Sequence, residues 1–174
     1  MRTLQVIASR TLGGAEGFFR RLCVGLTDRG CEVHAVLRQG AALSPALPMT
    51  IPRTELPLRT VWDPWSRSEL RQEIQTQRPH LVQTWMSRAT RLARVPRGVV
   101  HVARLGGFYK PAGFDHADAL VVNSRALADH LLAADLPAKR VHLIGNFVDA
   151  PRACTADELA SLRAALPLPA DAWL

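Results

Sequence analysis

Two adjacent glycines near the N-terminus are the first residues whose type and spacing could support chemistry. Gly13 and Gly14 follow the apolar run 4–9, and Glu16 comes two residues later, at the start of a helical pattern. Glycines there let the backbone approach a phosphate or a sugar because no Cβ stands in the way. The N–H groups of a helix start attract anions. Two interpretations stay open: a ligand-contacting loop that includes Glu16, or a tight turn in which Glu16 only stabilises the helix dipole.

A second pair of glycines, Gly106 and Gly107, follows another expected strand, 98–105. The polar residues around this pair are Arg104, Tyr109 and Lys110. An arginine can hold a phosphate through two parallel hydrogen bonds, and a tyrosine can stack on a sugar and offer its hydroxyl. These side chains are candidates for binding the phosphates or hydroxyls of a ligand. The alternative is an exposed basic loop.

Three further residues are weaker candidates for chemistry. Trp85 and Arg88 lie at the end of the expected strand 80–85, where Trp85 either stacks on a sugar or closes the core. His116 precedes the expected strand 119–124 and is the one candidate for a catalytic contact, although a histidine in a loop is more often structural. Nothing places Asp115 and Asp118 across a reacting bond, so the pattern does not predict a pair of catalytic carboxylates.

The segments that must position these residues alternate between strands and helices. The expected strands are 4–9, 32–38, 80–85, 98–105, 119–124 and a last strand and turn at 140–149. The expected helices follow Gly14, begin at Ser66 with that serine as the cap, cover the basic segment 86–96, and span 124–134. Prolines between 45 and 57 allow at most a short edge strand. This order predicts an α/β fold, a Rossmann-like, doubly wound and mostly parallel sheet that gathers ligands at the carboxyl ends of its strands.

Composition bounds the protein class. The 174 residues, 48% of them hydrophobic, suit one ordinary domain. No apolar run is long enough for a membrane span and the start does not resemble a secretory signal, so a cytoplasmic location is expected. The three cysteines lack the pairing of a disulfide framework or a zinc site, and no metal is expected.

The positive charge is concentrated in the middle of the chain. Residues 51–110 contain eleven Lys or Arg against four acids, an excess equal to the net charge of +7 of the whole chain. Such a stretch indicates either an anionic partner, for example a membrane surface at which the protein is peripheral, or only a solvated basic face. Nucleic acid is not expected, since no recognition motif is present and aromatic residues are few.

An NADP-binding oxidoreductase is the first alternative. Residues 10–12 lengthen the loop after the first strand, and the glycines run GGAEG rather than G-x-G-x-x-G. Arg38 closes the second strand where an NAD enzyme has an acid, although an arginine there suits a 2′-phosphate. A second alternative is a non-catalytic module that binds anionic membranes.

Three segments together resemble one family. The stretches 13–38 (GGAEGFFRRLCVGLTDRGCEVHAVLR), 117–131 (ADALVVNSRALADHL) and 139–149 (KRVHLIGNFVD) resemble, in order and spacing, the N-terminal domain of retaining GT-B glycosyltransferases of the family 4 type. Residues 83–95 and 103–124 look closest to the lipopolysaccharide-core transferases of that family.

The resemblance implies a nucleotide-sugar donor as a substrate, no cofactor, and a glycan or lipid-linked acceptor. The acceptor would be bound mainly by this part of the protein, and the candidate acceptor-binding residues are Trp85, Arg88, Arg104, Gly106, Gly107, Tyr109 and Lys110. It places Gly13, Gly14 and Glu16 against the donor diphosphate and the transferred sugar, where backbone donors would stabilise the leaving group. Relatives that carry a histidine after the strand 98–105 differ from this chain, which has glycine there, so no general base is assigned.

The resemblance also predicts a domain boundary. Residues 1–150 would form the acceptor-side domain, and 151–174 a linker helix followed by the start of a donor-binding domain, with 170–174 (ADAWL) beginning its first strand. The Arg and Lys pair and the E-x7-E element of the family have no counterpart here. The fragment would therefore be inactive alone. The expected location is the cytoplasm, where the protein would be peripheral at the inner face of the membrane.

Overall fold

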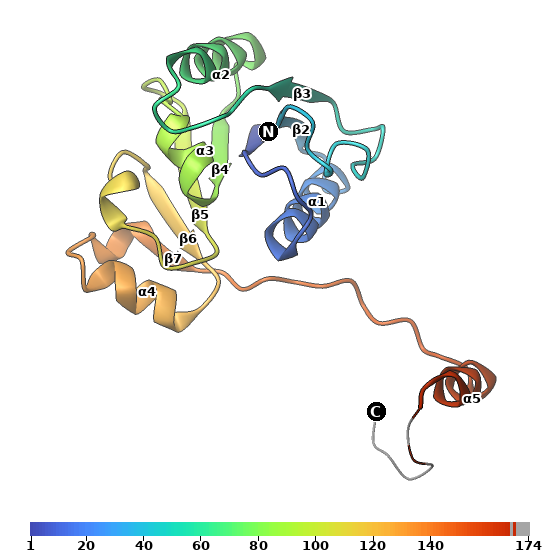
Figure 1. The fold of residues 1–174 in the computed structure, drawn as a ribbon. Helices are drawn as coiled ribbons and strands as arrows, with labels where there is room; N and C mark the ends of the chain where they lie inside the picture. Colours follow the sequence, from blue (N-terminus) through green and yellow to red (C-terminus); the bar gives the residue numbers. More distant parts are fainter. Residues whose placement is uncertain (168, 170–174) are drawn as a thin grey trace.

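A seven-stranded sheet, parallel throughout, carries the fold of the computed structural model, which describes residues 1–167 and 169. The strand order is β3-β2-β1-β4-β5-β6-β7 (Figure 1). The strands are β1 (Arg2–Ile7), β2 (Glu32–Arg38), β3 (Arg53–Leu56), β4 (Leu81–Trp85), β5 (Val100–Leu105), β6 (Ala119–Val122) and β7 (Val141–Leu143). The predicted α/β class is confirmed, and the proline-rich region supplies the edge strand β3, as expected.

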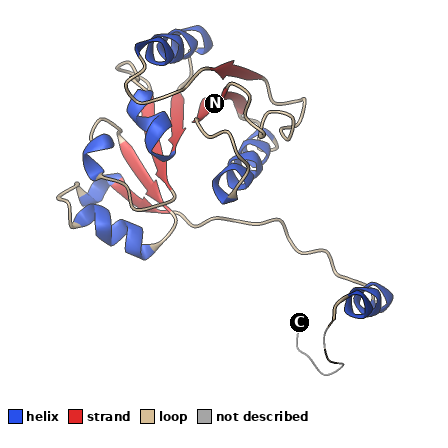
Figure 2. Ribbon diagram, in the orientation of Figure 1, coloured by secondary structure: helices blue, strands red, loops and turns tan. Residues whose placement is uncertain are grey.

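Helices cover both faces of this sheet (Figure 2). The α-helices are α1 (Gly14–Thr27), α2 (Pro64–Gln77), α3 (Met86–Leu92), α4 (Arg125–Leu132) and α5 (Ala156–Ala165). Two 3-10 turns are η1 (Pro111–Gly113) and η2 (Ala138–Arg140). The buried side chains of α1 share a cluster with one face of β1 and β2, whereas those of α2 and α3 share a cluster with the other face. The sheet is therefore doubly wound.

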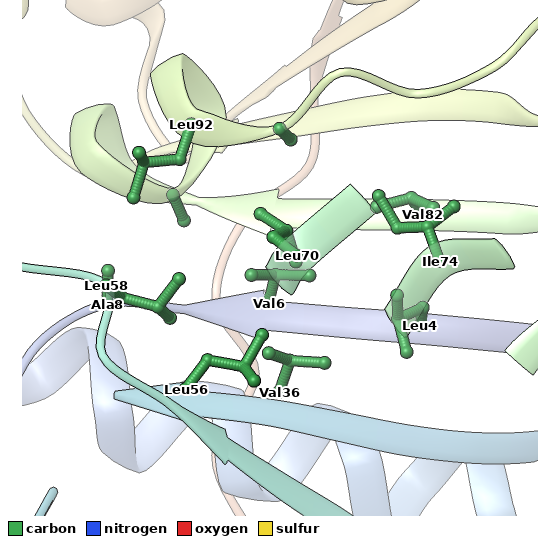
Figure 3. Packing of buried hydrophobic residues seen from close by; sticks show 12 residues of the cluster. Leu4, Val6, Ala8, Val36, Leu56, Leu58, Leu70, Ile74, Val82 and Leu92 are labelled. Atoms are coloured by element: carbon green, nitrogen blue, oxygen red, sulfur yellow. The ribbon is translucent and has the colours of Figure 1, made fainter. Parts of the chain in front are cut away.

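The hydrophobic core between the sheet and the helices α2 and α3 is built from every second side chain of the central strands. Leu4 and Val6 point to the same face because side chains alternate along a strand, and Val36 and Val82 join them from the neighbouring strands. Figure 3 shows Leu70 and Ile74 of α2 packed over this row. Burying each such side chain contributes about 1.5 to 3 kcal/mol, so this layer fixes the sheet that positions the loops.

One helix start differs from the expectation. We predicted that α2 begins after a capping Ser66, but the helix begins at Pro64 and Asp63 is the cap, accepting hydrogen bonds from the N–H groups of Trp65 and Ser66. Ser66 lies inside the first turn, and its hydroxyl donates to the second oxygen of Asp63 at 2.7 Å. The prediction was wrong because Asp is as good a cap as Ser, and proline is well suited to the first helical position.

The winding direction changes between β1 and β4. The chain moves from β1 to β2 on one side, and from β4 through β5 to β7 on the other. The loops that leave β1 and β4 therefore diverge, which opens a crevice at the carboxyl edge of the sheet, the usual ligand position in such folds. Both glycine pairs lie at this edge, after β1 and after β5.

The segment after the sheet ends in a separate helix. Figure 1 shows an extended stretch leading from β7 to α5, which lies apart from the sheet. The predicted capping box is confirmed, since Thr155 and Glu158 each bond the other's backbone N–H. Residues 170–174, where we expected a strand to begin, lie outside the described residues. The domain boundary near residue 150 stays a prediction. No helix in the described residues is long and apolar enough to cross a membrane.

Candidate functional site

A cavity of about 200 Å³ opens at the carboxyl edge of the sheet, at the change in winding direction. Its walls come from the start of α1, the ends of β4 and β5, and the segments after β6 and β7. The lining residues are Gly14, Ala15, Phe18, Trp85, Met86, Arg104, Leu105, Gly106, Asn123 and Asn146. The structure thus brings one residue of each glycine pair to the same cavity.

The first glycine pair forms the entry to α1. Gly13 is the N-cap, and its carbonyl accepts the N–H of Gly17 at 2.9 Å. At Gly14, a Cβ would have no atom within 4 Å, so the residue borders open space in the cavity wall. A side chain at position 14 would therefore occupy the cavity without disturbing its neighbours.

Glu16 lies in the first turn of α1 and is only 6% exposed. Its Oε2 is 3.1 Å from the position that a Cβ on Gly13 would take, so the carboxylate folds back over the glycine loop. Among the described residues it has no hydrogen-bond partner and no ion-pair partner within 4 Å. Burial and the charge of Glu16 together raise the pKa of the Tyr109 hydroxyl. Glu16 therefore places a negative charge at the edge of the site.

Aromatic rings form one wall of the cavity. Trp85 is 2% exposed and its Nε1 donates to Oε1 of Gln5 at 3.0 Å, which fixes the indole. Its ring centroid lies 5.8 Å from that of Phe18 and 5.2 Å from that of Phe19. Of the two interpretations of Trp85, the structure therefore supports closure of the core, with one surface of the ring left to the cavity.

Arg104 contributes a buried positive charge. The side chain is in the buried class, and its guanidinium carbon lies 4.5 Å from the ring centroid of Phe18. Nη2 donates to the carbonyl of Ile144 at 3.1 Å and to Oδ1 of Asn146 at 2.7 Å. Burial lowers its pKa from the usual arginine range. No carboxylate among the described residues pairs with it, so its charge remains available to an anion in the cavity.

Arg104 also secures the segment that leaves the sheet. Its two hydrogen bonds hold the backbone at Ile144 and the amide of Asn146, and Phe147 packs on Phe18 at 4.9 Å between centroids. This role was not expected from the sequence, which placed Arg104 in the strand 98–105 and made it a candidate for binding an acceptor. Side chains alternate between the two faces of a strand, so the surroundings of Arg104 depend on which face of β5 it occupies. Arg104 lies on the face toward Phe18 of α1.

A second cavity, of about 380 Å³, shares Trp85 and Met86 with the first. The predicted acceptor residues Arg88 and Tyr109 line it. Arg88 is half-buried and its Nη1 donates to the carbonyl of Ala8 at 3.2 Å. The structure therefore distributes the predicted binding residues over two adjoining cavities.

Five predicted residues line neither cavity: Gly13 and Glu16, described above, and Gly107, Lys110 and His116. Gly107 lies beside Tyr109, whose ring would be 3.6 Å from a Cβ there. Lys110 is exposed. The Nε2 of His116 donates to the carbonyl of Thr90 at 2.9 Å, beneath α3, and its ring centroid lies 5.3 Å from that of His101 with the two rings tilted by 45°. We expected His116 at the mouth of the site, and the structure instead places it with α3 and the start of β5.

The sequence reasoning missed several lining residues. Phe18 read as a core residue by its helical spacing, and Met86 followed Trp85 at a strand end without a role of its own. Asn123 stood beside the expected helix cap Ser124, and Asn146 read as a turn residue. Arg10 and Arg38 follow β1 and end β2, yet the sequence reasoning assigned neither to an acceptor site. A common signal was available for five of these six, since Arg10, Arg38, Met86, Asn123 and Asn146 lie at the carboxyl end of a strand or within three residues after it.

The described part of the chain holds no group of three or more His, Cys, Asp or Glu side chains that could bind a metal ion. Burial raises the pKa of the Cys23 thiol far above its usual value, which makes this cysteine a core residue rather than a nucleophile. The polar groups at the site are therefore glycine backbone, amides, hydroxyls, arginines and the carboxylate of Glu16.

Comparison with known proteins identifies the family. The sequence profile of Glycosyltransferase Family 4 matches residues 12–152. The lipopolysaccharide core biosynthesis glycosyltransferase LpsE of Rhizobium meliloti (strain 1021) is 29% identical over 174 residues, which cover 92% of this chain and 46% of LpsE. The chain thus spans about half the length of this relative.

Solved structures agree on the fold. HepE of Anabaena, in complex with UDP, superposes with a TM-score of 0.73 at 18% identity, over 94% of this chain and 49% of HepE. The lipopolysaccharide outer core galactosyltransferase WaaB superposes with a TM-score of 0.62 at 12% identity, over 85% of this chain and 46% of WaaB. The UDP-GlcNAc 2-epimerase of Neisseria meningitidis superposes with a TM-score of 0.63 at 14% identity, over 84% of this chain and 46% of the epimerase. The fold alone therefore does not separate transfer from epimerisation.

The architecture is the Rossmann-like fold of the N-terminal domain of GT-B glycosyltransferases, as predicted. The profile match includes both glycines of the first pair, the second glycine pair and the segment held by Arg104. By this match the chain belongs to Glycosyltransferase Family 4.

Proposed function

We propose that the protein is a retaining glycosyltransferase in which this chain supplies the acceptor-side domain. The donor is a nucleotide sugar, and the acceptor is a glycan or a lipid-linked glycan of the lipopolysaccharide type. The observation that carries the proposal is the cavity at the carboxyl edge, where Gly14 and Gly106 leave room for a ligand and the buried Arg104 supplies a positive charge. The relative LpsE, named for lipopolysaccharide core biosynthesis, supports this class of acceptor.

The cavity offers the interactions that a leaving diphosphate needs. As the bond between the sugar and the diphosphate breaks, negative charge grows on the phosphate oxygens, and fixed donors that face this charge lower the barrier. The start of α1 provides backbone N–H groups, Arg104 provides a guanidinium, and Asn123 and Asn146 provide amides. The charge of Arg104 acts strongly because the side chain is buried.

Bond formation to the sugar removes a proton from the acceptor hydroxyl, and a base must accept this proton. In the retaining scheme that we propose, the acceptor oxygen bonds to the anomeric carbon on the face from which the diphosphate leaves, and a phosphate oxygen takes the proton. His116 is not needed in this scheme, which fits its position beneath α3. Glu16 then orients the sugar or the glycine loop rather than acting as a base.

A turnover assay tests the proposal. We expect the protein at its natural full length to release the nucleotide from a sugar donor only when an acceptor glycan is present, and we expect residues 1–174 alone to give no turnover. Mass spectrometry of the acceptor would show the added sugar. Turnover by the 174-residue chain alone would contradict the proposal that this chain supplies only the acceptor-side domain.

We also propose that the protein is peripheral at the inner face of the cytoplasmic membrane. Trp62 and Trp65 are 80% and 76% exposed on the loop before α2 and on its first turn. The guanidinium of Arg91 lies 5.7 Å from the ring centroid of Trp62, and Arg59 is exposed nearby in the sequence. Exposed tryptophans beside arginines suit the boundary between lipid headgroups and acyl chains.

Liposome sedimentation tests this surface. Replacing Trp62 and Trp65 together by Ala should weaken binding to vesicles that contain anionic lipid by about tenfold, because the indoles no longer bury apolar area. Phe108→Ala, at an aromatic residue that is 68% exposed on another loop, is the matched control. Equal sedimentation of the double variant and the wild-type protein, or equal binding to neutral vesicles, would contradict a basic, tryptophan-bearing membrane surface.

A further inference from the structure

We propose that Arg10, Arg38 and Arg88 form an anion pocket that holds a phosphate group carried by the acceptor. The inference rests on the proposed transferase function and gives the acceptor a chemical feature, a phosphate monoester a short distance from the hydroxyl that receives the sugar. The pocket is the second cavity, of about 380 Å³.

Three neighbouring strands bring the arginines together. Arg10 follows β1, Arg38 is the last residue of β2, and Arg88 lies in the helix directly after β4. These strands are adjacent in the order β2-β1-β4, and all three are parallel. Their carboxyl ends therefore meet at one point of the sheet edge, and all three arginines line the same cavity.

The pocket carries an uncompensated charge. Among the described residues no carboxylate oxygen lies within 4 Å of a nitrogen of any of the three arginines. Glu55, the acid of β3, accepts the N–H of Gly40 at 3.0 Å. Partial burial and the charges of Arg88 and Arg10 lower the pKa of Arg38. Like charges gathered without a counter-ion cost stability, which indicates that an anion completes the site.

Local hydrogen bonds hold the guanidinium of Arg88 and the backbone of Arg10 in place. The Nη1 of Arg88 donates to the carbonyl of Ala8 at 3.2 Å, which leaves Nε and Nη2 free to bind. The carbonyl of Arg10 accepts the N–H of Ala42 at 2.9 Å, so the loop after β2 fixes the backbone at this residue. A guanidinium that is fixed in advance loses less entropy when it binds an oxyanion through two parallel hydrogen bonds.

The size and the other lining groups favour a sugar phosphate. The hydroxyls of Ser9, Thr11 and Tyr109 share the cavity with the arginines and can bind sugar oxygens. Three positive charges match a phosphate dianion better than a single carboxylate. A volume near 380 Å³ is larger than one small ion needs.

The position separates this pocket from the donor. It shares Trp85 and Met86 with the first cavity but not Gly14, Gly106 or Arg104. A ligand whose phosphate sits among the arginines can therefore extend past Trp85 into the first cavity. We infer that the pocket selects and orients the acceptor, while the glycine-lined cavity accommodates the reacting groups.

A binding titration that needs no turnover tests this inference. Glucose 6-phosphate, glucose, inorganic phosphate and UDP would each be added to the ¹⁵N-labelled protein, with the backbone and arginine Nε–H resonances as the readout. We expect glucose 6-phosphate to shift residues 9–11, 38 and 88, glucose to leave them unchanged, and inorganic phosphate to bind there more weakly. UDP should instead shift residues that line the first cavity.

The variants Arg10→Gln and Arg38→Gln should each weaken binding of glucose 6-phosphate by about tenfold, the loss expected for a charge-assisted contact. Arg97→Gln removes the same charge from an exposed loop before β5, at the opposite edge of the sheet, and should bind like the wild-type protein.

Three results would overturn the inference: equal affinity in the Arg10 and Arg38 variants and the Arg97 control, equal affinity for glucose 6-phosphate and inorganic phosphate, or displacement of glucose 6-phosphate by UDP from residues 9–11. Sugar transfer that persists without a phosphate requirement would remove the pocket's role but leave the transferase proposal intact. Binding of glucose 6-phosphate among the arginines without any transferase activity would support the pocket but contradict the transferase proposal.

Discussion

The substitution Gly14→Val should reduce sugar transfer by at least about a hundredfold while leaving the free energy of unfolding nearly unchanged. Position 14 borders the cavity, and a Cβ there meets no atom within 4 Å, so the valine side chain has room in the unliganded protein. The same room is where a diphosphate or a sugar must approach the backbone. Misplacing reacting groups by about 1 Å can cost a factor of about 100 in rate.

The matched control for this variant is Gly17→Val, one turn later on α1. A Cβ at Gly17 would lie 3.8 Å from the guanidinium of Arg21, an ordinary contact, and Gly17 does not line the cavity. Both variants replace glycine by valine in the same helix, so they share a similar change in helix propensity. Turnover and urea denaturation should be measured for both. Undiminished turnover by Gly14→Val, or an equal loss in Gly17→Val, would contradict the assignment of the glycine loop.

Acidification should destabilise the fold through His101. This histidine is 1% exposed, its Nε2 is paired with the hydroxyl of Thr84 at 2.9 Å, and its Nδ1 has no partner among the described residues. Burial, followed by the charge of His116, lowers the pKa of His101 to about 4, although Asp118 acts in the opposite direction. The folded protein therefore keeps His101 neutral where the unfolded chain already binds a proton.

The sign and the size of the effect follow from this difference. Between pH 6.5 and about 4 the unfolded state holds the extra proton, so stability falls as the pH falls. The free energy of unfolding should drop by about 2.5 kcal/mol between about pH 7.5 and 4.5 from His101 alone. Burial also lowers the pKa of His116, which adds to the loss in the same direction.

Urea denaturation at the two pH values measures this contribution. His101→Gln keeps a polar contact for Thr84 but cannot take up a proton, so its stability should fall by about 2.5 kcal/mol less than that of the wild-type protein. His142→Gln, at an exposed residue of β7, should behave like the wild-type protein. Identical pH dependence in all three proteins would show that His101 does not titrate as its burial requires.

The fold followed from the sequence because its main signals are local. Strand and helix alternate with clear apolar periods, Gly30 takes a positive φ of 77° in the turn just after α1, and Thr155 and Glu158 form the expected capping box. The start of α2 was misplaced because Asp63, Pro64 and Ser66 all favour a helix start, and only their hydrogen bonds show that Asp63 is the cap.

The site was predicted less completely because it depends on tertiary placement. The loops that bear glycines could be located, since parallel strands bring their carboxyl ends to one edge. The sequence did not show that Arg104 is buried against Phe18 and holds Asn146, because these residues are far apart along the chain. Nor did it show that Arg10, Arg38 and Arg88 converge, which follows from the strand order β2-β1-β4.

The fate of the donor sugar tests the central claim most directly, because this fold occurs in both glycosyltransferases and a UDP-GlcNAc 2-epimerase. The natural full-length protein, a panel of nucleotide sugars and a lipopolysaccharide-core acceptor would be followed in one reaction by ¹H NMR. We predict a new glycoside on the acceptor, with the anomeric configuration of the donor, together with release of the nucleotide. An epimerised nucleotide sugar, an inverted glycoside, or no transfer to any acceptor would contradict a retaining glycosyltransferase.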